Sequence, residues 1–213
     1  MKTDELIGLL AQGAGAVEPG AIARRYAAAL GWGAFGATLL MALVLGVRPD
    51  LRAAALLPMF WIKLAFPASL LAAGVVAASR LARPGVRLGR LVIALFAPLA
   101  AIWAMAAVEL AVAAPAARAQ LVFGSSWREC PFNIALLSVP AFIAAFWAMR
   151  RLAPTRLVRA GAVSGLVAGA LGASIYALHC TEIAATFLGL WYVAGMLIPT
   201  AAGALLGPRL LRW

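Results

Sequence analysis

The stretch Leu91–Ala113 reads LVIALFAPLAAIWAMAAVELAVA, and Glu109 is its only charged residue. An apolar run of about 20 residues is what an α-helix needs to cross the hydrocarbon core of a bilayer. The stretch is therefore predicted to form a transmembrane helix, and the rest of the chain repeats its character.

Five other apolar runs of similar length occur along the chain. They are Tyr26–Val47, Leu56–Ala78, Phe132–Met149, Ala160–Leu178 and Ile183–Leu206. The 213 residues are 65% hydrophobic and 12% charged, with a mean hydropathy of +0.99, so they cannot supply the polar surface of a soluble domain. The sequence predicts an all-α polytopic membrane protein, with six transmembrane helices packed as a compact bundle over residues 26–213.

The basic residues are distributed unevenly between the connecting loops. Thirteen lie in the N-terminal segment, the second and fourth loops and the tail: Lys2, Arg24, Arg25, Arg80, Arg83, Arg87, Arg90, Arg150, Arg151, Arg156, Arg159, Arg209 and Arg212. The other loops carry four: Arg48, Arg52, Arg118 and Arg128. Because cytoplasmic loops are enriched in Lys and Arg, this asymmetry predicts that both termini are cytoplasmic in a bacterial inner membrane.

The formal net charge of +11 has the same explanation. A nucleic-acid-binding face needs basic residues clustered on a soluble fold, whereas these arginines fall in short groups between apolar runs. We therefore expect the lipid bilayer as a partner and no direct contact with nucleic acid.

Residues 1–25 form the only sizeable segment outside the predicted spans. Thr3 is a candidate cap for a short helix, with Asp4 and Glu5 in its first turn, and Gly13 is its expected end. The apolar side of this helix would carry Leu6, Ile7, Leu9 and Leu10. Such a helix could lie on the lipid surface or dock into a groove of a partner protein, and composition leaves both open.

Two short polar islands carry the only cysteines. Cys130 lies in Ser126–Phe132, and Cys180 lies in His179–Glu182 beside the only histidine. In the predicted topology both cysteines face the periplasm at the same level, where disulfides persist. The charged or titratable neighbours that could support a sensing site there are Arg128, Glu129, His179 and Glu182.

Two ionisable residues fall inside the predicted spans, in the same outer zone as the cysteines. They are Lys63 and Glu109, and charged groups at such a depth are costly and usually paired or functional. Three interpretations are open: a Lys63–Glu109 ion pair, an ammonium that snorkels outward, or participation of both residues in a polar sensing cavity.

The fifth span has Gly161, Gly165 and Gly169 at intervals of four residues. Small residues at this spacing let helix backbones approach closely. Packing inside the bundle is the favoured interpretation, and a homodimer is the second.

No enzyme motif is present: the sequence lacks a glycine-rich phosphate loop, a zinc helix and a carboxylate pair at catalytic spacing. No cofactor is required, although Cys130, Cys180 and His179 could together hold a metal ion transiently, since thiolate and imidazole suit soft and borderline ions. A small transporter or channel subunit, or a membrane thiol oxidoreductase, are the alternatives to a regulatory protein.

The opening Met1–Ile7, the motif WREC at Trp127–Cys130 and the motif HCTE at His179–Glu182 resemble the NrsF family across essentially the full chain. Members of that family are six-helix inner-membrane anti-sigma factors that restrain an extracytoplasmic-function sigma factor. The resemblance implies that Cys130 and Cys180 sense heavy-metal or oxidative stress. It also implies that residues 1–25 contact the sigma factor.

Overall fold

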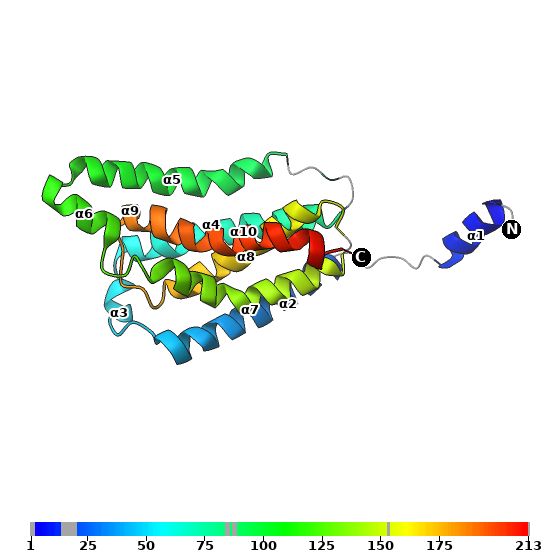
Figure 1. Ribbon diagram of the computed structural model, residues 1–213, viewed down its shortest axis with the longest axis horizontal. Coiled ribbons are helices and arrows are strands. Elements are labelled where there is room, and N and C mark those ends of the chain that lie inside the picture. Colours follow the sequence, from blue (N-terminus) through cyan, green and yellow to red (C-terminus); the bar gives the residue numbers. More distant parts are fainter. Residues whose placement is uncertain (1–2, 14–20, 84–85, 87–88, 153, 213) are drawn as a thin grey trace.

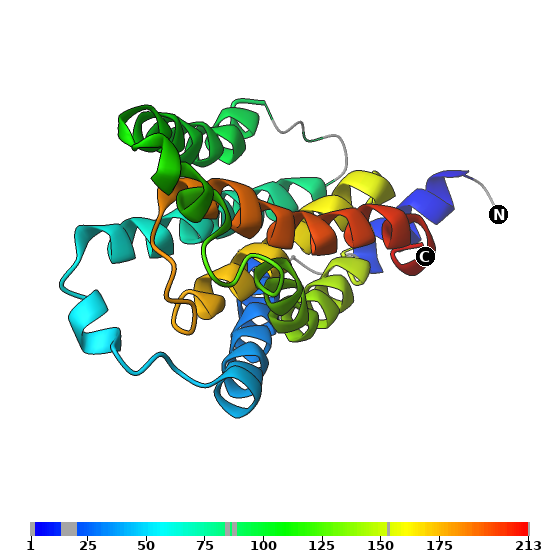
Figure 2. The same cartoon turned by 60° about the vertical axis from the view of Figure 1, so that its left-hand side comes forward.

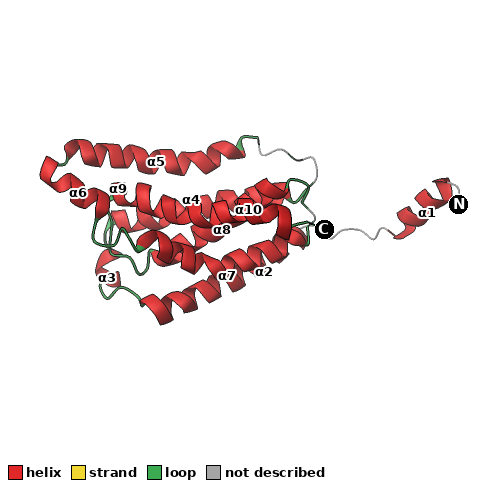
Figure 3. Ribbon diagram, in the orientation of Figure 1, coloured by secondary structure: helices red, strands yellow, loops and turns green. Residues whose placement is uncertain are grey.

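The computed structural model describes residues 3–13, 21–83, 86, 89–152 and 154–212, and every regular element among them is helical (Figure 3). Six helices are long and apolar enough to cross a membrane: Tyr26–Leu45, Pro58–Leu81, Leu91–Val112, Cys130–Arg150, Leu157–Tyr176 and Ala185–Leu210. The predicted fold class and six spans are confirmed, with ends that differ by a few residues. One difference bears on the site, because Cys130 is the first residue of its helix rather than part of the preceding loop.

Four spans are uninterrupted α-helices: α4 (Pro58–Leu81), α5 (Leu91–Val112), α7 (Cys130–Arg150) and α8 (Leu157–Tyr176). The first span is α2 (Ala21–Leu40), which continues into a π-helical turn, η1 (Met41–Leu45). The last is α9 (Ala185–Phe187), a second π-helical turn η2 (Leu188–Tyr192), and α10 (Val193–Leu210).

Three further helices lie outside the spans: α1 (Thr3–Gly13), α3 (Leu51–Ala54) and α6 (Pro115–Phe123). Helix α6 was not expected from the sequence. It has Pro115 in its first turn, where a missing N–H costs nothing, and it ends at Gly124, whose φ of 54° suits glycine. It has no buried residue, so it covers the end of the bundle rather than adding to its core.

Helix α8 is the centre of the bundle and packs against α10, α7 and α4 (Figure 1). Its glycines make this packing close. A methyl group on Gly161 or Gly165 would meet the main-chain carbonyl of Gly203 or Pro199 on α10. The favoured interpretation of the glycine spacing is therefore confirmed: α10 occupies this face, which is not free to form a homodimer.

Helix α5 lies at the edge of the bundle, beside α4 and α9 (Figure 2). Only 11% of the residues in its apolar 18-residue stretch are buried inside the protein, against 67% for the corresponding stretch of α8. One of its attachments is polar, since the Trp103 indole donates a hydrogen bond of 2.9 Å to the carbonyl of Gly189 in η2. An edge helix that is this apolar all round is suited to face lipid.

The connections between the long helices lie at two opposite ends of the bundle (Figure 1). One end, here called the cysteine end, consists of residues 46–57, 113–129 and 177–184 and includes α3 and α6. At the opposite end, here called the basic end, α4 ends, α7 is joined to α8, and α10 ends at Leu210. The arginine-rich loops therefore gather at one end, as the sequence predicts.

Candidate functional site

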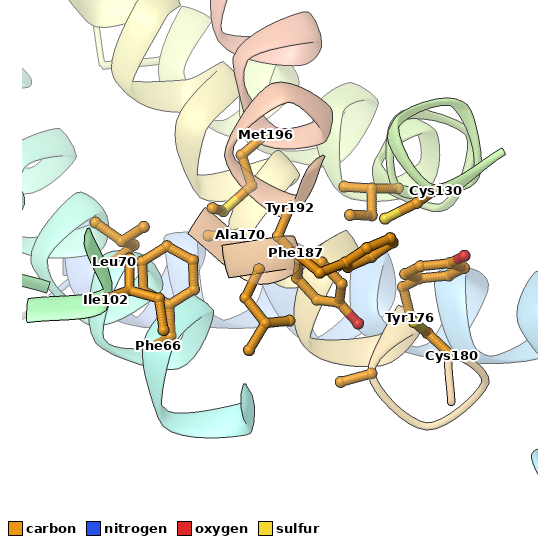
Figure 4. Packing of buried hydrophobic residues seen from close by; sticks show 14 of the residues in the cluster. Phe66, Leu70, Ile102, Cys130, Ala170, Tyr176, Cys180, Phe187, Tyr192 and Met196 are labelled. Carbon is orange, nitrogen blue, oxygen red and sulfur yellow. The ribbon is translucent and has the colours of Figure 1, made fainter. Parts of the chain in front are cut away.

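Both cysteines lie at the cysteine end within one buried cluster. Cys130 begins α7, and Cys180 lies four residues beyond Tyr176, the last residue of α8. Their exposed fractions are 0% and 3%, and both are free thiols. Figure 4 shows them among side chains of the same cluster, including Tyr176 and Tyr192. The prediction that the fold gathers both cysteines at one end is correct, but they are not joined by a disulfide.

The turn before α7 places Cys130. Its N–H donates to the carbonyl of Ser126 at 3.0 Å, and Pro131 follows in the first helical turn, where proline fits. Trp127 anchors this turn by packing against Trp191, with ring centroids 5.1 Å apart and the ring planes tilted by 45°. The turn that carries Cys130 is therefore supported both by α7 and by an aromatic cluster.

Two of the predicted supporting residues are exposed. Arg128 is exposed and lies over the ring of Trp127, 5.1 Å from its centroid. Glu129 is also exposed. Their charges therefore belong to the surface of this end rather than to the buried cluster.

Residues 178–182, here called the Cys180 segment, are tied to the linker between η1 and α3. The guanidinium of Arg48 donates to the carbonyl of Cys180 at 3.1 Å, and the main-chain N–H of Arg48 donates to the carbonyl of Leu178 at 3.2 Å. The ring of His179 bonds to the carbonyl of Gly46 through Nδ1 at 2.9 Å. These contacts hold the segment at the C-terminal end of α8, where cations are favoured by the helix dipole.

Arg48 also forms an ion pair at this end. Its guanidinium meets Asp50 in two hydrogen bonds of 2.7 Å each. The hydrogen bonds to Asp50 raise the pKa of Arg48, and the same hydrogen bonds lower the pKa of Asp50. From the sequence alone, Arg48 is only a loop charge; the one signal for the pair is an Arg and an Asp two residues apart in a loop with few charges.

Lys63 ties the Cys180 segment to α4. Its side chain is completely buried, and its ammonium donates to the carbonyls of Cys180 at 2.6 Å and Glu182 at 2.7 Å. The ring of Tyr192 lies 5.5 Å from the same nitrogen. The snorkelling interpretation is thus wrong, because the ammonium bonds to a protein loop instead of reaching solvent.

Glu109 has different partners, so the expected Lys63–Glu109 ion pair is wrong. The Glu109 carboxylate accepts hydrogen bonds from the N–H and the hydroxyl of Thr186, at 2.8 and 2.7 Å. The physical reason is the start of α9 there: a carboxylate near a helix N-terminus meets N–H groups that have no partner inside the helix.

Glu182 connects the Cys180 segment to the loop that leads to Cys130. Its carboxylate accepts from the N–H of Ser125 at 2.8 Å and from the Ser125 hydroxyl at 2.7 Å. Gly124 makes this approach possible, because a Cβ there would lie 2.7–2.8 Å from the carboxylate of Glu182. A single segment, 178–182, therefore contacts the linker at residues 46–48, helix α4 and the loop at Ser125.

A partly polar pocket of about 260 Å³ lies beside Cys180. Its lining residues are Leu45, Val47, Arg48, Pro49, Ser126, Glu129, Tyr176, His179, Cys180 and Thr181. Of the predicted sensing cavity, Glu129, His179 and Cys180 line this pocket, whereas Lys63, Glu109, Arg128 and Glu182 do not.

The side chains proposed as metal ligands are not assembled in this arrangement. In the described part of the chain, no group of three or more His, Cys, Asp or Glu side chains is placed to hold a metal ion. A site made by Cys130, Cys180 and His179 would need the cysteine end to rearrange, and it stays a prediction.

The N-terminal helix stands apart from the bundle, on the side of the basic end (Figure 1). Leu6 and Ile7 are 42% and 59% exposed, so an apolar surface is available there. The side chains of Leu9 and Leu10, which complete the predicted apolar side, lie outside the described residues.

These features define a multi-pass helical membrane protein whose polar side chains gather at its two ends. The family described as "NrsF: Negative regulator of sigma F" matches residues 10–213. The chain is 53% identical over 213 residues to the "Probable anti-sigma-F factor NrsF" of Azospira oryzae, covering 100% of both chains. It is 41% identical over 215 residues to the "Anti-sigma-F factor NrsF" of Caulobacter vibrioides, again covering 100% of both. No solved structure matches.

The chain belongs to the NrsF family. The resemblance drawn from the MKTDELI, WREC and HCTE motifs is confirmed. Membership places the chain among regulatory proteins that are not enzymes, which sets the thiol oxidoreductase alternative aside.

Proposed function

We propose that this protein is an integral-membrane anti-sigma factor that binds an extracytoplasmic-function sigma factor on the cytoplasmic side and releases it under stress. The observation that carries the proposal is the full-length similarity to two anti-sigma-F factors. The proposed orientation places the basic end in the cytoplasm, because basic loops are retained there.

The proposed sigma contact is the apolar side of α1, made of Leu6, Ile7, Leu9 and Leu10. Exposure of Leu6 and Ile7 supports it, as does the position of α1 beyond the basic end (Figure 1). A short amphipathic helix that presents leucines can dock into a groove of a partner. Burying one leucine contributes roughly 1.5–3 kcal/mol, so losing two should release the partner.

The experiment compares two variants of equal charge. Leu6→Asp with Leu10→Asp alters the apolar side, while Gly8→Asp with Gln12→Asp adds the same charge to the opposite side of α1. Membranes are isolated from cells that carry an epitope-tagged sigma factor, and the tag is quantified in the membrane and soluble fractions. We expect the first variant to shift the sigma factor to the soluble fraction and the second to retain it. Retention by both variants would show that α1 does not dock in this way.

The proposed sensor is the cysteine end, where heavy-metal or oxidative stress acts on Cys130 and Cys180. Their membership of one buried cluster supports a joint response. Because both thiols are buried, a stimulus must favour an opened state of this end over the closed one, which is the differential affinity that signalling requires.

A reporter driven by the sigma factor tests the sensor. Cys130→Ser and Cys180→Ser should each keep the sigma factor restrained during stress while leaving basal restraint intact. Serine at these positions removes the sulfur but also buries a hydroxyl group. Cys130→Ala and Cys180→Ala remove the sulfur without adding a hydroxyl, so they distinguish the two effects. If all four single variants respond to cadmium ions or to peroxide as wild type does, the cysteines are structural.

A further inference from the structure

We propose that Lys63 is a positioning residue that clamps the Cys180 segment onto α4 and keeps the Cys180 thiol closed to reagents in water. The inference deepens the proposed function, on which it rests only for the sensing role of Cys180. The clamp itself concerns only how readily reagents in water reach the sulfur of Cys180.

The geometry is that of a tether between two distant parts of the chain. The Lys63 ammonium bonds to the carbonyls of Cys180 and Glu182, at 2.6 and 2.7 Å, from a helix 117 residues earlier in the sequence. These two carbonyls flank Thr181, so one side chain fixes the segment on both sides of that residue. Lifting Cys180 away from the bundle requires both bonds to break.

The charge of Lys63 is held without a carboxylate. Among the described residues of this end, Arg48 pairs with Asp50, whereas Lys63 meets carbonyl dipoles and the face of the Tyr192 ring. A buried ammonium without an anion is costly, and an apolar side chain of similar size would be cheaper. Ionisable residues at such depth in a membrane protein are therefore expected to have a role.

A second cation contacts the same carbonyl. The guanidinium of Arg48 lies 3.1 Å from the carbonyl oxygen of Cys180 and is shared with Asp50. Arg48 joins the segment to the neighbouring linker, whereas Lys63 joins it to a transmembrane helix. Loss of Lys63 should therefore remove the tie between the segment and α4 while leaving the linker attached.

The test measures alkylation of a single thiol in the full-length protein. With Cys130→Ala in the background, Cys180 is the only cysteine, and its rate of reaction with a water-soluble maleimide is followed in membranes that contain no sigma factor. Because labelling of a buried thiol follows the population of the open state, we expect Lys63→Met to label at least ten-fold faster. A rate within two-fold of the parent overturns the proposal.

Two controls separate the clamp from general loosening. Ser69→Ala removes a polar group from the same helix, where the Ser69 hydroxyl bonds to the carbonyl of Phe66 one turn earlier, and its rate should equal that of the parent. In a Cys180→Ala background, Cys130 should react at the same rate with and without Lys63→Met, because α7 holds it. An equal acceleration at Cys130 would mean that the whole end has loosened, which also overturns the proposal.

If Lys63→Met does not yield folded protein, Lys63→Gln removes the charge and shortens the donor, and the same acceleration is expected. The assay contains no sigma factor. A failed clamp therefore leaves the anti-sigma proposal standing, and a chain that binds no sigma factor can still show the clamp.

Discussion

The carboxylate of Glu109, near the end of α5, accepts both the N–H and the hydroxyl of Thr186 at 2.8 and 2.7 Å, and so caps the start of the last span. This contact attaches the edge helix to the bundle together with the Trp103–Gly189 hydrogen bond. Hydrogen bonds to a charged group contribute about 1.5–3 kcal/mol.

The first prediction follows from that contact. Glu109→Ala should lower the apparent Tm in detergent, and Glu109→Gln should lower it less, because the amide keeps one acceptor. Gln120→Ala, at an exposed position of α6, is the control and should leave the Tm unchanged. Identical Tm values for Glu109→Ala and Gln120→Ala would show that the cap contributes nothing.

The second prediction concerns the contact between α8 and α10. Gly165→Ala would place a methyl group against the carbonyl of Pro199, and main chain cannot move aside as a side chain can. Overpacking of this kind costs about 1–3 kcal/mol. The Tm of Gly165→Ala should fall clearly, whereas Gly31→Ala, with nothing within 4 Å of its Cβ, should match or exceed wild type.

The third prediction separates backbone strain from crowding at the cysteine end. Gly46 and Gly124 have φ of 76° and 54°, a region that side chains disfavour. Only at Gly124 would a Cβ also meet the carboxylate of Glu182. Gly124→Ala should therefore lower the Tm more than Gly46→Ala does. An equal loss of Tm in both variants would mean that the whole effect comes from the backbone angle φ.

The fourth prediction uses the Arg48–Asp50 pair. Its hydrogen bonds lower the pKa of Asp50, so the stabilisation is present above the ordinary carboxyl pKa of about 4 and is lost as pH falls through the lower folded value. The guanidinium stays charged throughout. Asp50→Asn should have a lower Tm than wild type at pH 7, and the difference should disappear in strong acid. A difference that persists there would point to a contribution from shape rather than charge.

The fifth prediction is the membrane orientation. A reporter active in the cytoplasm should work when fused after Arg156, at the basic end, and fail when fused after Arg118, at the cysteine end. An enzyme active only in the periplasm should give the opposite pattern. A periplasmic signal after Arg156 would reverse the proposed orientation and put the cysteines in the cytoplasm.

Sequence by itself predicted the large-scale features because they depend on composition over long windows. Stretches such as Leu91–Ala113 have one stable form in lipid, in which every main-chain group is bonded within the helix. The alternation of basic and less basic loops likewise separates the two ends of the bundle. Because α7 and α8 are joined by a short loop, Cys130 and Cys180 lie at the same end. The glycine spacing in α8 predicted a close helix contact but not its partner, α10.

Tertiary structure decided which polar groups meet. Lys63 and Glu109 have opposite charges and similar depth, so pairing was a reasonable expectation from the sequence. Their actual partners are the carbonyls of residues 180 and 182 and the start of α9, because the last loop and helix come between them. Main-chain carbonyls and N–H groups exist at every residue, so no pattern of side chains reveals which of them a buried charge will use.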